Sequence, residues 1–121
     1  MSHPQQKQSF FMLVKATRAW LSLTPKERFA YLQEKVVPIL QAHPQVTMRF
    51  FDAEAFCARY SDIILWETQD TRSYQSLIEG LRETTFWDHY FAVLEIIPAI
   101  EDAYALHYEV SPLQASTSPT P

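Results

Sequence analysis

The order in which apolar patterns follow one another constrains the fold of this chain most. Four segments alternate side chains as β-strands do, at residues 9–17, 46–52, 61–68 and 91–97. Two segments with apolar residues at helical spacing lie between them, one starting at Thr24 and one after Asp70. The predicted order is therefore strand, helix, strand, strand, helix, strand. Right-handed crossovers reduce it to a ferredoxin-like α+β fold, a βαββαβ antiparallel sheet in strand order 4, 1, 3, 2 with both helices on one face.

Local signals support both helices. Thr24, Pro25 and Glu27 form the pattern of a capping box with proline at the first helical position. Pro38 lies inside the first helical pattern and predicts a kink there, because proline removes a backbone hydrogen bond. Gly80 lies inside the second helix, at a cost of about 1 kcal/mol relative to alanine, and predicts a close approach of helix to sheet.

The strands are apolar on both faces, yet two helices can cover only one. We expect the helices to cover Phe10, Met12, Val14, Val46, Met48, Phe50, Ala92, Leu94 and Ile96. The opposite face then carries Phe11, Leu13, Phe51, Val93 and Ile97. Burying such a set is worth up to about 10 kcal/mol, so exposure on a monomer is unfavourable. We predict a homodimer that pairs two sheets by a twofold axis, a dimeric α+β barrel.

One domain accounts for most of the chain. We expect a flexible N-terminus over residues 1–8, a single ferredoxin-like domain over 9–110 and a disordered tail over 111–121, which is rich in Ser, Thr and Pro. Residues 103–110 alternate again, with Tyr104, Leu106, Tyr108 and Val110 on one side. This alternation predicts a short fifth strand that pairs with a sheet edge.

Composition excludes several classes of function. The net charge is -4 and the pI is about 5.5, so we expect no nucleic-acid partner. The polar N-terminus, the absence of a long apolar run and the single cysteine, Cys57, predict a cytoplasmic protein with no membrane partner. Gly80 is the only glycine, which excludes phosphate-binding loops, dinucleotide fingerprints and the glycine-flanked nucleophile of serine hydrolases.

Several strings resemble those of a known family. They are Arg49–Phe56, Ser61-Asp62 followed by Trp66–Thr68, Tyr74 with Leu77–Glu79, and Phe86-Trp87 leading to Tyr90-Phe91 and Ile97–Asp102. Over roughly residues 8–104 the chain resembles the darcynin family of bacterial proteins. That family has no assigned activity, so the resemblance implies no catalytic residue. The architecture is similar to that of dimeric α+β barrel proteins, which include cofactor-free monooxygenases, polyketide cyclases, lactone isomerases and some haem proteins.

Charged residues on the strands are the candidates for catalysis. Lys15, Glu67 and Glu95, with Arg49 as a ligand-binding neighbour, could act as general acid and base in an apolar chamber, because burial and pairing shift pKa values toward neutrality. The alternative is an ion-pair belt at the dimer seam. Strand alternation places either Trp66 or Glu67 inside, but not both.

Aromatic residues are the candidates for ligand binding. Trp20, Tyr60, Trp66 and Trp87 could line a pocket for a flat ligand, although aromatic residues of this kind are more often core. His89 is a candidate base or haem ligand, or else an exposed loop residue. Asp52, Glu54 and Asp62 could be read as oxygen ligands for a hard cation, but solvated hairpin acids are the preferred interpretation. The histidines lack zinc-site spacing, so we expect no metal and no cofactor.

The sequence therefore predicts a homodimer that binds a small aromatic or polyketide-like molecule. Such a protein could be a cofactor-free acid–base enzyme of the cyclase, isomerase or monooxygenase type. A noncatalytic binding or assembly module is the first alternative, and a haem-binding protein is the second.

Overall fold

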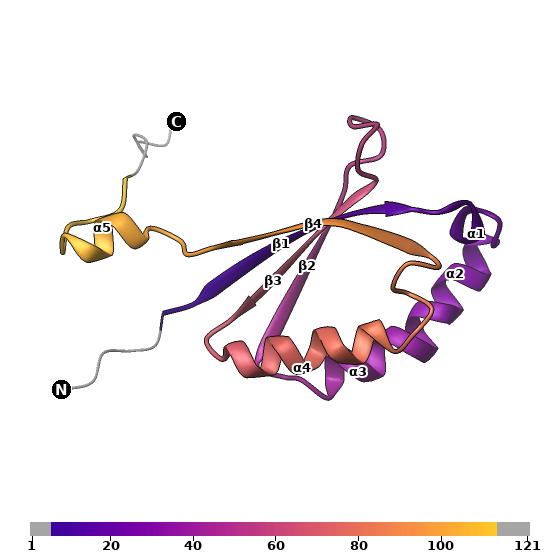
Figure 1. Ribbon diagram of the computed structural model, residues 1–121, viewed down its shortest axis with the longest axis horizontal. Coiled ribbons are helices and arrows are strands. Elements are labelled where there is room, and N and C mark those ends of the chain that lie inside the picture. The colour runs from indigo at the N-terminus through magenta and orange to yellow at the C-terminus, as the bar shows by residue number, and fades with distance from the viewer. Residues whose placement is uncertain (1–5, 114–121) are drawn as a thin grey trace, which may run out of the picture.

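The computed structural model describes residues 6–113. Its elements are β1 (Gln8–Ala16), α1 (Arg18–Leu21), α2 (Pro25–Tyr31), the π-helical turn η1 (Leu32–Val36), α3 (Val37–Gln41), β2 (Val46–Asp52), β3 (Asp62–Thr68), α4 (Thr71–Arg82), β4 (Phe91–Ala99) and α5 (Ala103–His107). The four strands form one antiparallel sheet in the order β2-β3-β1-β4, which confirms the predicted topology. Helices α1 to α4 lie on one side of this sheet (Figure 1).

The first helical segment begins as predicted and is interrupted before Pro38. Thr24 and Glu27 form the capping box, with Pro25 in the first turn. Between α2 and α3, the N–H of Val37 donates to the carbonyl of Leu32, one residue further back than in an α-helix. A π-turn of this kind relieves the clash that a proline ring makes with the preceding turn. The predicted kink is therefore a single π-helical turn.

Gly80 marks a close contact between two helices. A Cβ at Gly80 would lie 3.3 Å from Cγ2 of Ile39, which is on α3. The close approach expected at this glycine is therefore present, but it joins α4 to α3. The prediction that it would join helix to sheet was wrong, because this side of α4 faces the neighbouring helix.

The core lies between the sheet and helices α1 to α4. Its fully buried large side chains are Trp66, Met12, Leu77, Leu81 and Val14. Cross-strand pairing places Phe10 opposite Trp66 and Met12 opposite Ile64, so these side chains share the helix-covered face. The neighbouring positions on the strands consequently form the opposite surface, which we call the open face.

A β-bulge changes which residues of β4 face the helices. The register of β4 against β1 shifts between Leu13 and Val14, so Val14 pairs with Val93 while Leu13 pairs with Glu95. Val93 packs against the core, and Leu94 is 51% exposed. The expectation that Ala92 and Leu94 face the helices and Val93 faces away was wrong, because the extra residue of a bulge reverses the alternation.

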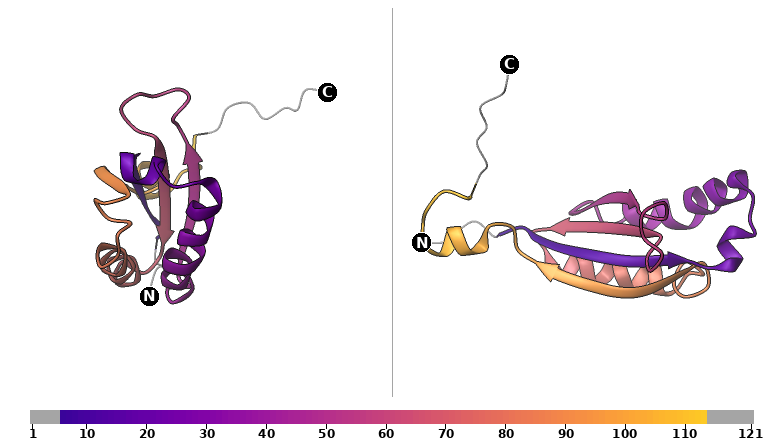
Figure 2. Two further views of the ribbon diagram at one scale, coloured as in Figure 1. Left: turned by 90° about the vertical axis from the view of Figure 1, so that its right-hand side faces the viewer. Right: turned by 90° about the horizontal axis from the view of Figure 1, so that it is seen from above.

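The expected fifth strand is a helix. Residues Ala103–His107 form α5, which follows a left-handed residue, Asp102 (φ 53°). In Figure 1 and in the right-hand view of Figure 2, α5 stands apart from the sheet and its covering helices. Of the predicted tail, residues 111–113 are exposed, and residues 114–121 lie outside the described residues, as do residues 1–5 of the predicted flexible N-terminus. None of the helices within residues 6–113 has the length and apolarity needed to span a bilayer.

Candidate functional site

A cavity of about 590 Å³ opens between the helices and one end of the sheet. Its apolar walls come from α1, the α2–η1 segment, β2, the loop between α4 and β4, and the start of β4. They are formed by Trp20, Leu32, Phe50, Phe86 and Phe91. The loop between β2 and β3, residues 53–61, closes one side. An apolar cavity of this volume with a few polar groups is the usual form of a small-molecule site.

Two aspartates face each other at the polar side of the cavity. Asp52 pairs directly with Asp62 across the β2–β3 ladder, and both line the cavity. Asp62 is buried, and a carboxylate oxygen from each of Asp52, Glu54 and Asp62 lies within 4.8 Å of the others. Burial raises the pKa of Asp62 to about 6, against the lowering effect of a hydrogen bond from Ser61, and the nearby acids Asp52 and Glu54 raise it further. Asp62 therefore changes protonation state close to neutral pH.

Ser61 fixes the orientation of Asp62. The Ser61 hydroxyl donates to Oδ2 of Asp62 at 2.7 Å and accepts from the backbone N–H of Ala16, also at 2.7 Å. The backbone N–H of Ser61 donates to the carbonyl of Val14 at 2.9 Å. These bonds tie the start of β3 to β1, so the carboxyl group has a fixed position at the cavity wall.

The rim of the cavity carries a lysine, a cysteine and a tyrosine. Lys15 donates from Nζ to the carbonyl of Ala58 at 3.2 Å. Backbone hydrogen bonds from Tyr60 and then Arg59 lower the pKa of the Cys57 thiol. Tyr60 donates its hydroxyl to Oε1 of Glu95 at 3.0 Å, and this bond raises the pKa of Tyr60. Glu95 therefore contacts a residue of the cavity lining, Tyr60, although it does not line the cavity itself.

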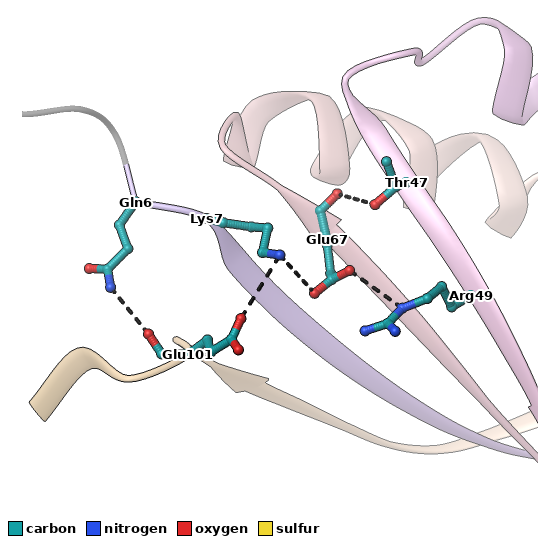
Figure 3. A network of polar contacts seen from close by, with 6 residues as sticks. All are labelled: Gln6, Lys7, Thr47, Arg49, Glu67 and Glu101. Carbon is teal, nitrogen blue, oxygen red and sulfur yellow. Dashed lines mark hydrogen bonds and ion pairs between the residues drawn. The ribbon is translucent and has the colours of Figure 1, made fainter. Parts of the chain in front are cut away.

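Glu67 belongs to a different polar cluster on the open face (Figure 3). Its carboxylate lies 3.3 Å from Nζ of Lys7 and 3.6 Å from Nε of Arg49, and Lys7 also approaches Glu101 at 4.0 Å. A second hollow, of about 560 Å³, contains Arg49 and Glu67 together with apolar side chains such as Phe11 and Phe51. The negative charge of Glu67 is therefore paired with two cations, Lys7 and Arg49. This pairing agrees with the alternative interpretation, in which these charges form ion pairs.

The structure thus separates the predicted site residues. Lys15, Trp20 and Tyr60 line the first cavity, while Arg49 and Glu67 lie at the other end of the sheet on the open face. Trp66 is 2% exposed and belongs to the core, so Glu67 is the residue of this pair that faces away from the helices. The guanidinium of Arg82 lies over the ring of Trp87, and His89 is exposed beside Tyr90. Catalytic and binding roles for all of these residues stay predictions.

Sequence reasoning missed the importance of Asp62. It interpreted Asp52, Glu54 and Asp62 as solvated hairpin acids, whereas Asp62 is buried and all three line the cavity. A usable signal was present, because a hairpin between 46–52 and 61–68 brings the two aspartates opposite each other. Like charges at directly opposed positions are unfavourable and favour retention of a proton by one of them.

Fold and cavity together define a single-sheet ferredoxin-like α+β protein with an open cavity between sheet and helices. The family model described as "Darcynin, domain of unknown function" matches residues 3–118. A darcynin homolog of Granulibacter bethesdensis is 50% identical over 99 residues, which cover 81% of this chain and 80% of the relative. Darcynin 1 of Acinetobacter baumannii is 38% identical over 90 residues, covering 74% of this chain and 99% of the relative. The chain belongs to the darcynin family, as the resemblance predicted.

Solved structures with the same fold are more distant. A haem-binding protein from Thermus thermophilus superposes with a TM-score of 0.70 at 13% identity, over 88% of this chain and 45% of that chain. A mutant chlorite dismutase from Candidatus Nitrospira defluvii gives a TM-score of 0.67 at 8% identity, over 82% of this chain and 41% of that chain. This chain therefore spans less than half the length of these two proteins. At such identities the likeness shows a common fold and nothing about the ligand.

Proposed function

We propose that this protein binds a small, flat, largely apolar molecule in the cavity between sheet and helices, with Asp62 as its polar contact. The observation that carries the proposal is a buried carboxyl group with a pKa of about 6 at the wall of an aromatic cavity of about 590 Å³. Strongly perturbed acids in clefts are typical of functional sites.

The cavity walls favour an aromatic ligand. Phe29 and Phe50, which are 72% and 46% exposed, offer ring surface that pairs well with another ring, while Trp20 and Phe91 are buried in the wall. The polar wall carries three acids, so it favours a ligand that donates a hydrogen bond, such as a phenol or an enol. At this wall an anionic group would meet repulsion from Asp52 and Glu54, although Lys15 and Arg28 line other parts of the cavity.

Asp62 could also move a proton to or from such a ligand. An acid that titrates near neutral pH is effective in both directions of proton transfer. In an enolisation, the Asp62 carboxylate would take a proton from a carbon next to a carbonyl group, and the electron pair of that C–H bond would form the enolate. Of the three residues predicted to act as acid and base, Lys15 lies at this cavity.

The open face supports the predicted homodimer. Three large apolar side chains on this face are partly exposed: Phe11 by 37%, Phe51 by 46% and Ile97 by 43%. Figure 2 (right) looks onto this face and shows the strands in front of the helices. Pairing two such faces would remove these side chains from water, and the ion pairs of Glu67 would lie at the rim.

Binding can be tested by NMR with 1-naphthol, a neutral phenol with two fused rings. The proposal predicts saturable shifts of the backbone amides of Trp20, Phe50 and Asp62. An Ala58→Trp variant, which adds a ring to an exposed residue of the cavity lining, should weaken binding at least tenfold. The matched control Ala55→Trp changes an exposed residue of the same loop outside the lining and should bind normally. Equal binding by both variants, or shifts elsewhere on the protein, would overturn the proposal.

Turnover can be separated from binding with 2-tetralone, an aromatic ketone. An acid–base enzyme should speed the exchange of the ketone's α-hydrogens for deuterium in D₂O, and Asp62→Asn should remove the acceleration. Binding without any acceleration would support the noncatalytic binding module instead.

Haem is the second candidate ligand, favoured by the haem-binding neighbour of the same fold. The described residues do not fit a histidine-ligated haem, because no histidine of residues 6–113 lines the cavity. The ring of His43 bonds to the Ile39 carbonyl and the Ser76 hydroxyl, and His89 is exposed. A Soret band after mixing with haemin that is lost in His89→Ala would support haem binding at this residue, and an unchanged band would argue against it.

A further inference from the structure

The loop between β2 and β3 presents an exposed aromatic ring on the open-face side of the sheet. Residues 53–61 form this loop, which rises from the sheet on the side opposite α3 and α4 (Figure 1). Phe56 lies within the loop and is 92% exposed. Aromatic side chains presented in this way act as interface anchors where a partner offers a pocket for them.

Two hydrogen bonds tie the loop to the strands. Nζ of Lys15, on β1, donates to the carbonyl of Ala58 at 3.2 Å. The Tyr60 hydroxyl donates to Oε1 of Glu95, on β4, at 3.0 Å. Phe56 therefore has a defined place relative to the sheet, and this preorganisation lowers the entropy cost of binding through its ring.

The hollow of about 560 Å³ on the same face is a pocket of matching chemistry. The apolar side chains that line it are Phe11, Phe51, Ile63, Leu65 and Ile100. Ser9 also lines it and pairs with two other lining residues, Glu67 and Ala99, at the end of the sheet that is far from the loop. The hollow therefore extends to the Ser9 end of the sheet, whereas the loop leaves the sheet at the opposite end.

One symmetry operation brings this loop to this hollow. A twofold axis between two facing sheets can run along the strands or across them. An axis across the strands places each strand over the same strand of the second copy, with the two running in opposite directions. The loop at one end of the β2–β3 hairpin then lies over the far end of the same hairpin in the second copy, where the hollow opens. An axis along the strands would instead place the loop over β1 and β4 at the Lys15 end.

The apolar area is sufficient for a stable dimer. Phe56 and the exposed parts of Phe11, Phe51, Ile97 and Ile100 amount to roughly 500 Å² per copy, at about 150–250 Å² for a complete aromatic side chain. Apolar atoms make up about 60% of a typical interface, so the total is roughly 800 Å² per copy, which is the standard size.

Charge does not oppose this contact. Acidic and basic side chains are mixed at both ends of the open face, because Lys15 and Glu95 lie toward the loop and Arg49 and Glu67 line the hollow. Neither end presents a surface of a single sign that would repel the second copy. The match between the Phe56 ring and the hollow therefore selects the orientation.

We propose that two copies of this chain pack open face to open face, so that Phe56 of each copy inserts into the hollow of the other from its Ser9 end, beside Ile100. The twofold axis then lies between the two sheets and runs across the strands. This inference rests on the proposed homodimer, to which it adds an anchor residue, a receiving pocket and an orientation.

Disulfide trapping tests the placement directly. All variants carry Cys57→Ser, which removes the only native thiol. Chains with Phe56→Cys are mixed with chains that carry Ile100→Cys at the hollow, and the mixed disulfide should be the main linked product after oxidation. The matched mixture replaces Ile100→Cys by Ala92→Cys, which lies at the Lys15 end and should stay largely unlinked to Phe56→Cys. Equal or preferential linkage to Ala92→Cys, or linkage to neither position, would overturn the proposal.

Sedimentation equilibrium separates this inference from the dimer itself. Phe56→Ser should raise the dimer dissociation constant at least tenfold, because each dimer loses two ring contacts. The control Phe29→Ser changes another exposed ring, 72% accessible on α2, and should leave the constant unchanged. Phe51→Asp, a change within the hollow, should abolish the dimer.

The outcomes distinguish the two claims. If Phe51→Asp dissociates the dimer while Phe56→Ser leaves it unchanged, the open-face dimer stands and the insertion of Phe56 is wrong. If Phe51→Asp leaves the dimer intact, or if the wild-type chain is monomeric at high micromolar concentration, both are wrong.

Discussion

At the scale of single residues, Asp62 carries most of the functional argument. It lies opposite Asp52 in a ladder and is held by the Ser61 hydroxyl. A buried carboxyl group is stable only if its charge is compensated or if it keeps a proton. No Lys, Arg or His of residues 6–113 pairs with Asp62 within 4.0 Å, so its ionised form is disfavoured and its pKa is raised.

The raised pKa of Asp62 gives a prediction about stability. Its pKa is about 6 in the folded state against 3.8 for the free side chain. The protonated group therefore stabilises the fold fully below pH 3.8, and this contribution is lost as the pH rises to 6. Each unit of pKa difference is worth about 1.4 kcal/mol, so about 2 kcal/mol should be lost after a discount for solvent screening.

Urea unfolding of wild type and Asp62→Asn at pH 4 and pH 7.5 measures this difference. The variant should gain about 2 kcal/mol relative to wild type between the two pH values. Glu79→Gln, which changes an exposed acid of α4 outside this cluster, is the control and should follow wild type closely. If the free energy of unfolding changed with pH by the same amount in wild type and Asp62→Asn, the pKa of Asp62 would not be raised by folding.

Single residues also show the limits of the sequence. Alternation along 61–68 correctly assigned Trp66 and Glu67 to opposite faces, because side-chain direction follows from the strand itself. The burial of Asp62 could not be predicted in the same way, because it depends on how the 53–61 loop and α1 close the end of the sheet. Spacing therefore predicted the direction of a side chain, and tertiary packing determined its surroundings.

At the scale of elements, the sequence predicted the helix starts, which depend on a few neighbouring residues. The capping box at Thr24 and the start of a helix after Asp70 were predicted correctly, since both depend on a few neighbouring residues. The bulge in β4 and the helix at 103–107 were not. The bulge depends on the register of β4 against β1, which the sequence of β4 does not contain. The helix was predicted as a strand because the alternating pattern of Tyr104, Leu106 and Tyr108 is compatible with a strand and with a short helix.

The contact between α4 and α3 gives a prediction at this scale. In a free helix, valine in place of Gly80 would be neutral or slightly stabilising. Here a Cβ would already lie 3.3 Å from Ile39, and the two methyl groups of valine would overpack the contact. Gly80→Val should therefore destabilise the protein by about 1–3 kcal/mol.

Thermal unfolding followed by circular dichroism measures the effect. The control is Glu79→Val, which places valine at an exposed neighbouring position of α4 and should cost less than about 1 kcal/mol. A Gly80→Val protein as stable as wild type would show that α3 and α4 do not pack this closely.

At the scale of the whole molecule, one sheet separates two different surfaces. One side carries the core and the aromatic cavity, and the other is the open face with its ion pairs. The order of elements predicted this division, because two helical segments can cover only one side of a four-stranded sheet. It did not predict where the cavity would lie, since that depends on the packing of α1 and α2 against the sheet end.

The dependence of 1-naphthol affinity on pH, in wild type and in Asp62→Asn, tests directly whether Asp62 is the polar contact of the bound ligand. Wild type should bind more tightly at pH 7.5 than at pH 5, because the ionised Asp62 carboxylate accepts a stronger hydrogen bond from the phenol than the protonated group does. Removal of the ionisable group should make the affinity of Asp62→Asn nearly independent of pH over this range. Calorimetric titrations should therefore give two different profiles, and identical profiles for the two proteins would show that Asp62 does not contact the ligand.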